Sequence, residues 1–245
     1  MTAIKQVAGA IGALAVLAGC GGGADSSDGA ESEFAQGSAS TIQKASVEDM
    51  QSLDALHMEG SITQQGSEVG INISLTTDGD CSGTVSRGDS GEAEVVSLDG
   101  TSWFRPDEEF WRAQAGPQAE TIISTVGDKW VQLPEGDSSF ASFCDLQGLL
   151  DQVGTDNEKD SATKGETSDI GGREAIQLTT KDEQGGSTSS WVAVDDPHYI
   201  VKVDREGGES PGSITFSEFG EDASIEAPAD DEVITVEELQ KQAQG

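Results

Sequence analysis

The chain has 245 residues, enough for one domain of generous size or for one domain with flexible ends. Its formal net charge is -33, from 13 Lys and Arg against 46 Asp and Glu, and no basic stretch interrupts this excess of acid. Nucleic acid is therefore not expected as a partner, because binding it depends on cationic contacts to phosphate, and an anionic bilayer would repel the body of the protein.

The amino terminus predicts export and lipid attachment. Residues 6–19 read QVAGAIGALAVLAG, about the length of the hydrophobic region of a signal peptide and too short for a spanning helix. The stretch ends in Leu17-Ala18-Gly19-Cys20, which resembles the bacterial lipobox. That resemblance implies cleavage after Gly19, removal of residues 1–19, diacylglycerol on the Cys20 thiol and acylation, for example by palmitate, of the new amine. Only Lys5 supplies a cation before the stretch, which a misplaced start codon would explain.

The segment after the lipobox predicts a tether. Residues 21–41 consist of Gly, Ser, Ala, acids and a few other residues, with Phe34 as the single large apolar side chain. We expect residues 20–41 to be the lipidated cysteine and a flexible tether. An ordinary secretory signal or a short membrane helix is the alternative, but a tether directly after the cysteine is what an anchored surface lipoprotein needs.

Periodicity divides the rest of the chain into helices and short strands. Helical spacing of apolar residues predicts helices over residues 42–56 and 139–153 and a short one near the end of the chain, and a polar linker is expected over 154–169. Period-two alternation or short apolar runs between turns predict strands. These lie within 55–63, 69–75, 81–85, 93–105 (a hairpin around Asp99-Gly100), 128–133, 173–180, 188–196, 199–206 and 212–220.

Strands joined by turns of a few residues must be largely antiparallel, and clear alternation means that one sheet face is covered. We therefore predict an α+β fold with a single large curved antiparallel β-sheet, a half-barrel, holding helices on its concave face. The predicted domain spans residues 42–235, and residues 236–245 form a C-terminal tail.

The cysteines favour a disulfide. With Cys20 set aside, Cys81 and Cys144 remain, and an even pair in an exported domain is typical of a disulfide bond. A metal site is the alternative, but it would need about four ligands, and the chain has only two histidines, His57 and His198. We expect no metal and no cofactor.

A succession of motifs resembles the actinobacterial LppX/LprG-type lipoproteins and, more distantly, the LolA-like carriers. After the lipobox and tether come ALHMEGSIT at residues 55–63, the hairpin at 99–105, GGREAIQL at 171–178, SWVAVDDPHYIVKVD at 190–204, GSITFSEFG at 212–220 and IEAP at 225–228. The resemblance implies a half-open antiparallel sheet wrapped around helices. It also implies that acylated lipids bind between sheet and helices and are moved through the envelope.

A lipid-binding role predicts a cavity lined by large apolar side chains. The candidates are Ile71, Ile73, Leu75, Trp103, Phe110, Trp111, Trp130 and Phe143. The alternative is that the aromatic residues are core anchors between sheet and helix, since large aromatics dominate core energetics. The helix over 139–153 is a candidate lid, and the sequence does not decide whether it moves.

Motifs that suggest other chemistry have simpler explanations. The GDSG at residues 88–91 resembles the nucleophile segment of chymotrypsin-like proteases, but it reads as an exposed turn between two strands. Acidic clusters such as 107–109 and 230–232 lack the spacing of a calcium loop, and no phosphate-binding glycine loop is present. We expect a protein that is not an enzyme.

Two functions are compatible with these patterns. The first is a protein anchored at the outer face of the cytoplasmic membrane that buries an acyl-chain lipid or another apolar ligand. The second is an anchored interaction or sensor module with a filled core, which binds another envelope protein through an exposed patch.

Overall fold

The computed structural model describes residues 32–134, 143–156, 162–181, 185–208 and 210–243, and Ser32–Gly245 form one compact unit. The predicted signal peptide, Gly19, Cys20 and residues 21–31 of the predicted tether lie outside the described residues. Within the described ranges, no helix is long and apolar enough to cross a membrane.

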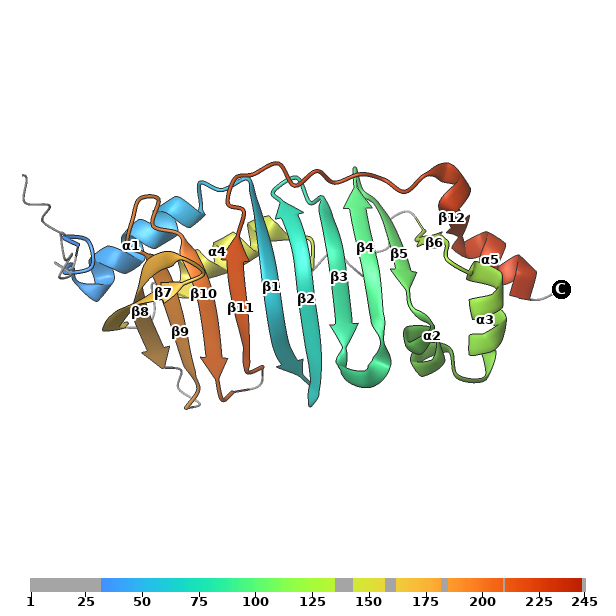
Figure 1. Ribbon diagram of the computed structural model, residues 1–245, viewed down its shortest axis with the longest axis horizontal. Coiled ribbons are helices and arrows are strands. Elements are labelled where there is room, and N and C mark those ends of the chain that lie inside the picture. The colour runs from blue at the N-terminus through green and yellow to red at the C-terminus, as the bar shows by residue number, and fades with distance from the viewer. Residues whose placement is uncertain (1–31, 135–142, 157–161, 182–184, 209, 244–245) are drawn as a thin grey trace, which may run out of the picture. The chain divides into compact units, whose positions relative to one another are not determined.

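A single open sheet dominates the domain (Figure 1). Its 12 strands lie in the order β12-β6-β5-β4-β3-β2-β1-β11-β10-β9-β8-β7. The predicted single large sheet is thus confirmed. The strands are β1 (Ala55–Gln64), β2 (Ser67–Thr76), β3 (Cys81–Arg87), β4 (Glu92–Leu98), β5 (Thr101–Pro106), β6 (Trp130–Gln132), β7 (Thr163–Ile170), β8 (Arg173–Lys181), β9 (Ser187–Ala193), β10 (Ile200–Glu206), β11 (Gly212–Ser217) and β12 (Val233–Thr235).

The sheet is largely antiparallel, as predicted, and contains one parallel pair among the described strands. Two antiparallel series, β1 to β6 and β7 to β11, meet where β1 pairs with β11. The exception is β12, which pairs parallel with β6. The chain from β11 to β12 runs along one end of the strands (Figure 1), and a connection of that length lets β12 enter the sheet parallel to its neighbour.

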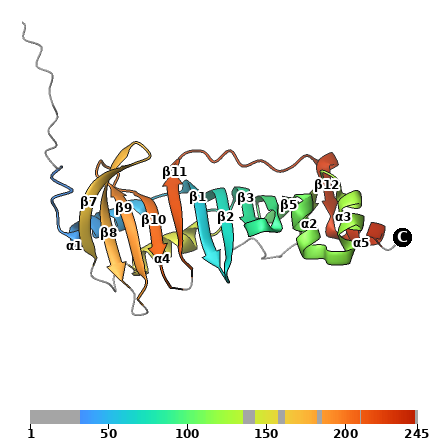
Figure 2. The ribbon, with the colours of Figure 1, turned by 60° about the horizontal axis from the view of Figure 1, so that its bottom comes forward.

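Helices cover one face of the sheet. The helices predicted over residues 42–56 and 139–153 correspond to α1 (Ala39–Met50) and α4 (Leu146–Asp156), and the short helix predicted near the end of the chain is α5 (Val236–Ala243). Two more helices are α2 (Glu108–Ala115) and α3 (Ala119–Val126). Figures 1 and 2 place α1 and α4 behind the half of the sheet that ends in β7, and α2, α3 and α5 at the β12 end. We call the face packed against α1 and α4 the inner face and the opposite face the outer face.

The main core lies between α1, α4 and the inner face. Its fully buried side chains include Ile42 and Met50 of α1 and Leu146 and Leu150 of α4, packed with residues of β1 to β4 and β8 to β10. A second, smaller core joins the inner face of β6 and β12 to α2, α3 and α5, and it is built on Val126, Val131 and Ile234. Phe104 of β5 packs against both cores.

Local chemistry explains where the helices begin. Ser38 caps α1 by accepting a hydrogen bond from the backbone N–H of Thr41, and Asp107 caps α2 in the same way through Phe110 N–H. At α5, Glu238 accepts from the backbone N–H of Thr235 (3.1 Å), and the hydroxyl of Thr235 accepts from Glu238 N–H (3.2 Å). This is a reciprocal capping box, and its hydrogen bonds lower the pKa of Glu238.

The N-terminal boundary of the domain lies earlier than residue 42. Ala35 is only 2% exposed, and the ring of Phe34 stacks on that of His198 with centroids 3.5 Å apart. The ammonium group of Lys164 donates to the carbonyls of Ala35 (2.8 Å) and Gly37 (3.1 Å). Residues 32–38, which the sequence placed in the tether, therefore pack on the domain.

Several elements or their boundaries differ from the prediction. The first helix ends at Met50 and not at residue 56, because Ala55 and Leu56 already belong to β1. The helices α2 and α3, within residues 108–126, were not predicted, and the edge strand β7 (Thr163–Ile170) begins inside the linker predicted over 154–169. The helix predicted over 139–153 begins at Leu146, and residues 135–142 lie outside the described ranges.

Candidate functional site

The predicted aliphatic cavity residues lie together on the inner face. Ile71, Ile73 and Leu75 alternate along β2 and are 9%, 0% and 1% exposed. Phe143, just before α4, packs against the same core and is partly buried. Ile73 and Leu75 are packed by protein side chains on all sides, so only the Ile71 end of this row approaches solvent.

The predicted aromatic residues lie in two other places. Trp111 belongs to the second core, with its ring 5.8 Å from Phe104 and 6.1 Å from Phe110. Its indole nitrogen is buried without a hydrogen-bond partner in the described part of the chain. Trp103 and Trp130 lie on the outer face, because the neighbouring residues Phe104 and Val131 face inward.

On the outer face, Trp130 is 8% exposed and is covered in part by Arg105, whose guanidinium carbon lies 4.6 Å from the ring centre. Arg105 also donates to both carboxylate oxygens of Glu94, at 2.9 and 2.7 Å. The structure therefore brings Ile71, Ile73, Leu75 and Phe143 to one core, Phe110 and Trp111 to another region, and Trp103 and Trp130 to the opposite face.

A set of inner-face residues that was not predicted is apolar yet only partly buried. Register places Val203, Ile214, Gly60, Ile71 and Val85 in one row across β10, β11, β1, β2 and β3. Three further residues of the same face, Met58, Ile62 and Phe216, are also partly exposed while they contact the main core. We call the following residues the inner row: Met58, Ile62, Val85, Val203, Ile214 and Phe216.

The helices leave the inner row uncovered at one end. In Figure 1, α1 and α4 cross behind the part of the strands near the start of β1, and the other ends of β1, β2 and β10 extend beyond them. The inward orientation of Met58 and Ile62 could have been predicted from the alternation in residues 55–63. Both lie an even number of positions from the buried Leu56, so their side chains are on the same face of the strand.

Glycines let the central strands approach each other closely on this face. A Cβ at Gly60 would lie 2.0 Å from the carbonyl oxygen of Ser213, and a Cβ at Gly83 would lie 2.1 Å from that of Asn72. Glycine within a strand often marks a bend or the close approach of another backbone or a ligand. Here the close group is the neighbouring strand.

The two remaining cysteines form the predicted disulfide. Cys81 and Cys144 are joined with Cα atoms 5.3 Å apart, and both residues are buried. The bridge fixes the segment just before α4 to the start of β3, on the inner face. It therefore sets the position of α4 beside the inner row.

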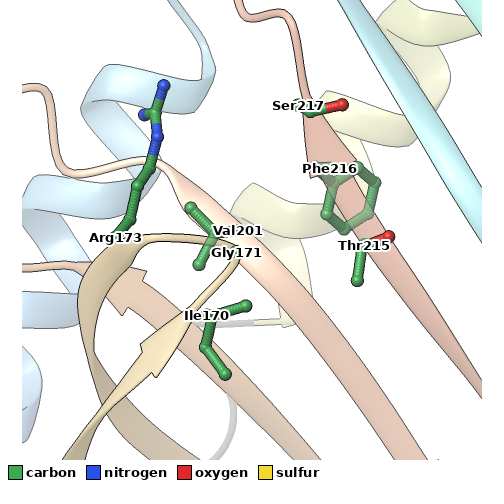
Figure 3. Close-up of a pocket in the computed structure, with 7 residues that line it drawn as sticks. All are labelled: Ile170, Gly171, Arg173, Val201, Thr215, Phe216 and Ser217. Carbon is green, nitrogen blue, oxygen red and sulfur yellow. The ribbon is translucent and has the colours of Figure 1, made fainter.

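A separate pocket lies on the outer face, where the β7–β8 hairpin folds across β10 and β11 (Figure 3). Its volume is about 240 Å³. It is lined by Ile170, Gly171, Arg173, Val201, Thr215, Phe216 and Ser217. Sequence patterns gave no sign of this pocket, because its residues come from the end of β7, the β7–β8 turn and strands β8, β10 and β11, which strand pairing brings together.

An aromatic pair stands beside the pocket. Phe219 stacks on Tyr199 with centroids 4.5 Å apart, and the guanidinium of Arg173 lies over the Phe219 ring. Burial raises the pKa of Tyr199, the Asp49 carboxylate raises it further, and the Arg173 charge acts in the opposite direction. The two histidines make local hydrogen bonds, His57 with Ser74 and His198 with the carbonyl of Ala193.

No family model and no curated protein matches the sequence. Solved structures do resemble the domain. Its fold is that of two mycobacterial lipoproteins. LprF from Mycobacterium bovis superposes with a TM-score of 0.57 and 14% identity, over 79% of this chain and 100% of LprF. LppX from Mycobacterium tuberculosis superposes with a TM-score of 0.50 and 12% identity, over 76% of this chain and 97% of LppX.

This likeness confirms the predicted LppX-like fold. At such low identity it establishes the fold alone, and membership of the LppX/LprG family and the more distant relation to LolA-like carriers stay predictions.

Proposed function

We propose that this protein is a lipid-anchored lipoprotein at the outer face of the cytoplasmic membrane that binds an apolar ligand, such as the acyl chain of a lipid, on the inner row. The observation that carries this proposal is the inner row itself, a contiguous apolar surface facing the core side and left partly exposed. In soluble proteins such surfaces mark sites for apolar ligands or partners.

The length of the inner row matches an acyl chain. From β10 to β3 the row crosses four strand spacings, or about 19 Å at about 4.8 Å each. One acyl chain spans about half of a hydrocarbon core about 30 Å thick, or roughly 15 Å. A chain lying across the strands would contact Val203, Ile214, Ile71 and Val85 in turn.

Binding of this kind would bury the apolar surface of the ligand and would involve no catalytic step. The row presents aliphatic, aromatic and thioether groups, which supply contact area without acid, base or nucleophile. We therefore propose a carrier or a receptor for lipid and not an enzyme.

The anchor is supported by the sequence. Cys20 follows a lipobox-like segment, and one acyl chain alone holds a protein only marginally, whereas two or more hold it stably. Residues 21–31 separate Cys20 from the first packed residue, and a chain of that length spans at most about 40 Å. The tether would keep the inner row within reach of the bilayer surface.

A second candidate is an anchored interaction module. The observation that favours it is the outer face, where Trp103 and Trp191 are partly exposed and Arg105 stacks on Trp130. Trp and Arg are the residues most often found at the centres of protein interfaces. Such a module would bind an envelope protein without using the inner row.

Displacement of a fluorescent fatty acid tests the ligand site. Val85→Asn places an amide in the inner row, and Thr84→Asn makes the same change on the outer face of the same strand. Burying an amide without a partner costs about 1–3 kcal/mol, so we expect about tenfold weaker probe binding for the first variant and unchanged binding for the second. Equal affinities in both variants, with equal thermal midpoints, would contradict the assignment of the site.

Membrane fractionation tests the anchor. The wild-type chain expressed in an actinobacterial host is expected in the membrane fraction, and Cys20→Ser is expected in the soluble or secreted fraction. Membrane retention of the Cys20→Ser protein would show that another segment holds it there.

A further inference from the structure

The outer-face pocket combines an apolar floor with one cation. The hairpin that joins β7 to β8 passes in front of β10, so that Ile170 and Gly171 face the side chain of Val201 and the residues of β11 (Figure 3). Val201 is 3% exposed and packs in a small cluster with Ala175 and Ala193. This cluster makes the floor rigid and hydrophobic.

Arg173 supplies the charge at the rim. Among the described residues, no ion pair joins it to a carboxylate, although acids outnumber bases by 46 to 13 in the chain. Its guanidinium carbon lies 5.4 Å from the centre of the Phe219 ring, which holds the group in place without neutralising it. The planar guanidinium keeps its hydrogen-bond donors for a ligand.

Two hydroxyl residues also line the pocket. Thr215 donates its hydroxyl hydrogen to the carbonyl of Glu59 (3.0 Å), which leaves its oxygen as an acceptor only. Ser217 lines the pocket beside Phe216 and is exposed, and its hydroxyl points away from Arg173 (Figure 3). The arrangement therefore offers the donors of Arg173 next to an aliphatic surface.

We propose that this pocket binds a small monocarboxylate with a short aliphatic chain. The carboxylate would accept from Arg173, and the alkyl group would lie on Ile170 and Val201. A water molecule occupies about 30 Å³ of liquid, so about 240 Å³ holds about eight non-hydrogen atoms. Carboxylic acids of four to six carbons have that size. The site lies on the opposite face of the sheet from the inner row, shares only Phe216 with it, and does not depend on the proposed function.

The charge around the pocket would make its ligand binding selective. The acidic surface repels anions in general, so an anion would accumulate here only through direct contact with Arg173. The amide of the same acid keeps the shape and loses the charge. We expect it to bind more weakly than the carboxylate, because hydrogen bonds to charged groups are about twice as strong as neutral ones.

Methyl NMR of the protein lacking residues 1–19 with Cys20→Ser, titrated with 4-methylpentanoate, tests the pocket. Saturable shifts confined to the methyl groups of Ile170 and Val201 are expected, with affinity about tenfold weaker in Arg173→Gln. Arg87→Gln, on β3, is the matched control and should bind as the unsubstituted protein does.

Thr215→Phe provides a second test that does not alter the charge. Thr215 is exposed and faces the pocket, so the larger side chain is accommodated without disturbing the core and fills the pocket (Figure 3). Loss of the Ile170 and Val201 shifts at an unchanged thermal midpoint is the expected result. Absence of saturable shifts in the unsubstituted protein, or equal binding of 4-methylpentanoate and its amide, would overturn the proposal.

Discussion

Removal of the Cys81–Cys144 disulfide tests how strongly α4 is held against the sheet. The bridge joins residues 63 positions apart. In the chain-entropy model a loop of about this length loses about 14 cal/mol/K in the unfolded chain, which corresponds to about 4 kcal/mol at 25 °C. Both residues are buried, so replacement by alanine adds a small cavity cost to this value.

The assay is urea unfolding, followed by tryptophan fluorescence, of a Cys81→Ala/Cys144→Ala variant in a Cys20→Ser background. With a slope of about 2.5 kcal/mol per molar urea, the midpoint should fall by about 1.5–2 M. Hydrogen exchange of Leu146–Asp156 should rise at the same time, because the bridge fixes the start of α4. The reduced form of the unsubstituted background is the control and should lose about the same free energy of unfolding.

A loss below about 1 kcal/mol would refute the reasoning. It would mean that the unfolded chain keeps residual structure, so that the bridge removes less entropy from it than the chain-entropy model assumes. Unchanged exchange in α4 despite a large global loss would mean that the bridge stabilises the domain without positioning this helix.

Three further predictions concern single positions. Gly60→Val should destabilise the domain by about 3 kcal/mol or prevent folding in thermal melts, because a Cβ there would meet the backbone of β11; a stable variant would contradict the close approach. Lys164→Met should speed proteolysis and hydrogen exchange of residues 32–38, and unchanged exchange would show that this segment is held by other contacts. The chain has a single tyrosine, so spectrophotometric titration should report the pKa of Tyr199 above 10.0, and Arg173→Gln should raise it further; a value at or below 10.0 would contradict its burial. Because the pKa of folded Tyr199 exceeds that of the unfolded chain, its contribution to stability is present below pH 10.0 and is lost as the pH rises through the folded value.

Elements with a strong local signal were predictable. The hairpin of β4 and β5 turns at Asp99-Gly100, and both residues have positive φ (51° and 78°), as the tight hairpin turn requires. The paired cysteines were likewise identified by their number and by the evidence for export. The edge strand β7 was missed because its exposed, polar side chains show no apolar alternation.

The helices α2 and α3 were missed although a start signal was present. Asp107 is followed by Glu108 and Glu109 in the first turn, a pattern typical of a helix N-terminus. We interpreted the aromatic residues at 110 and 111 as part of a ligand cavity and did not consider a helix there.

The candidate site depended on which face each side chain occupies, and this is set by strand pairing. Trp103 and Phe104 are adjacent large apolar residues, so alternation alone does not tell which one faces inward. Pairing of Phe104 with the buried Val95 turns Phe104 inward and Trp103 outward. The inner row was hidden for the same reason, since it is assembled from strands far apart in the sequence.

The measurement that tests the central claim most directly is native mass spectrometry of the protein that begins at residue 20 with Cys20→Ser. It would be purified from an actinobacterial host, with lipid extraction alongside. Without the anchor, any lipid found is cargo. The account predicts a stoichiometric acyl-chain lipid that is lost in Val85→Asn and kept in Thr84→Asn. A bare protein that also takes up no offered phospholipid or glycolipid would contradict it.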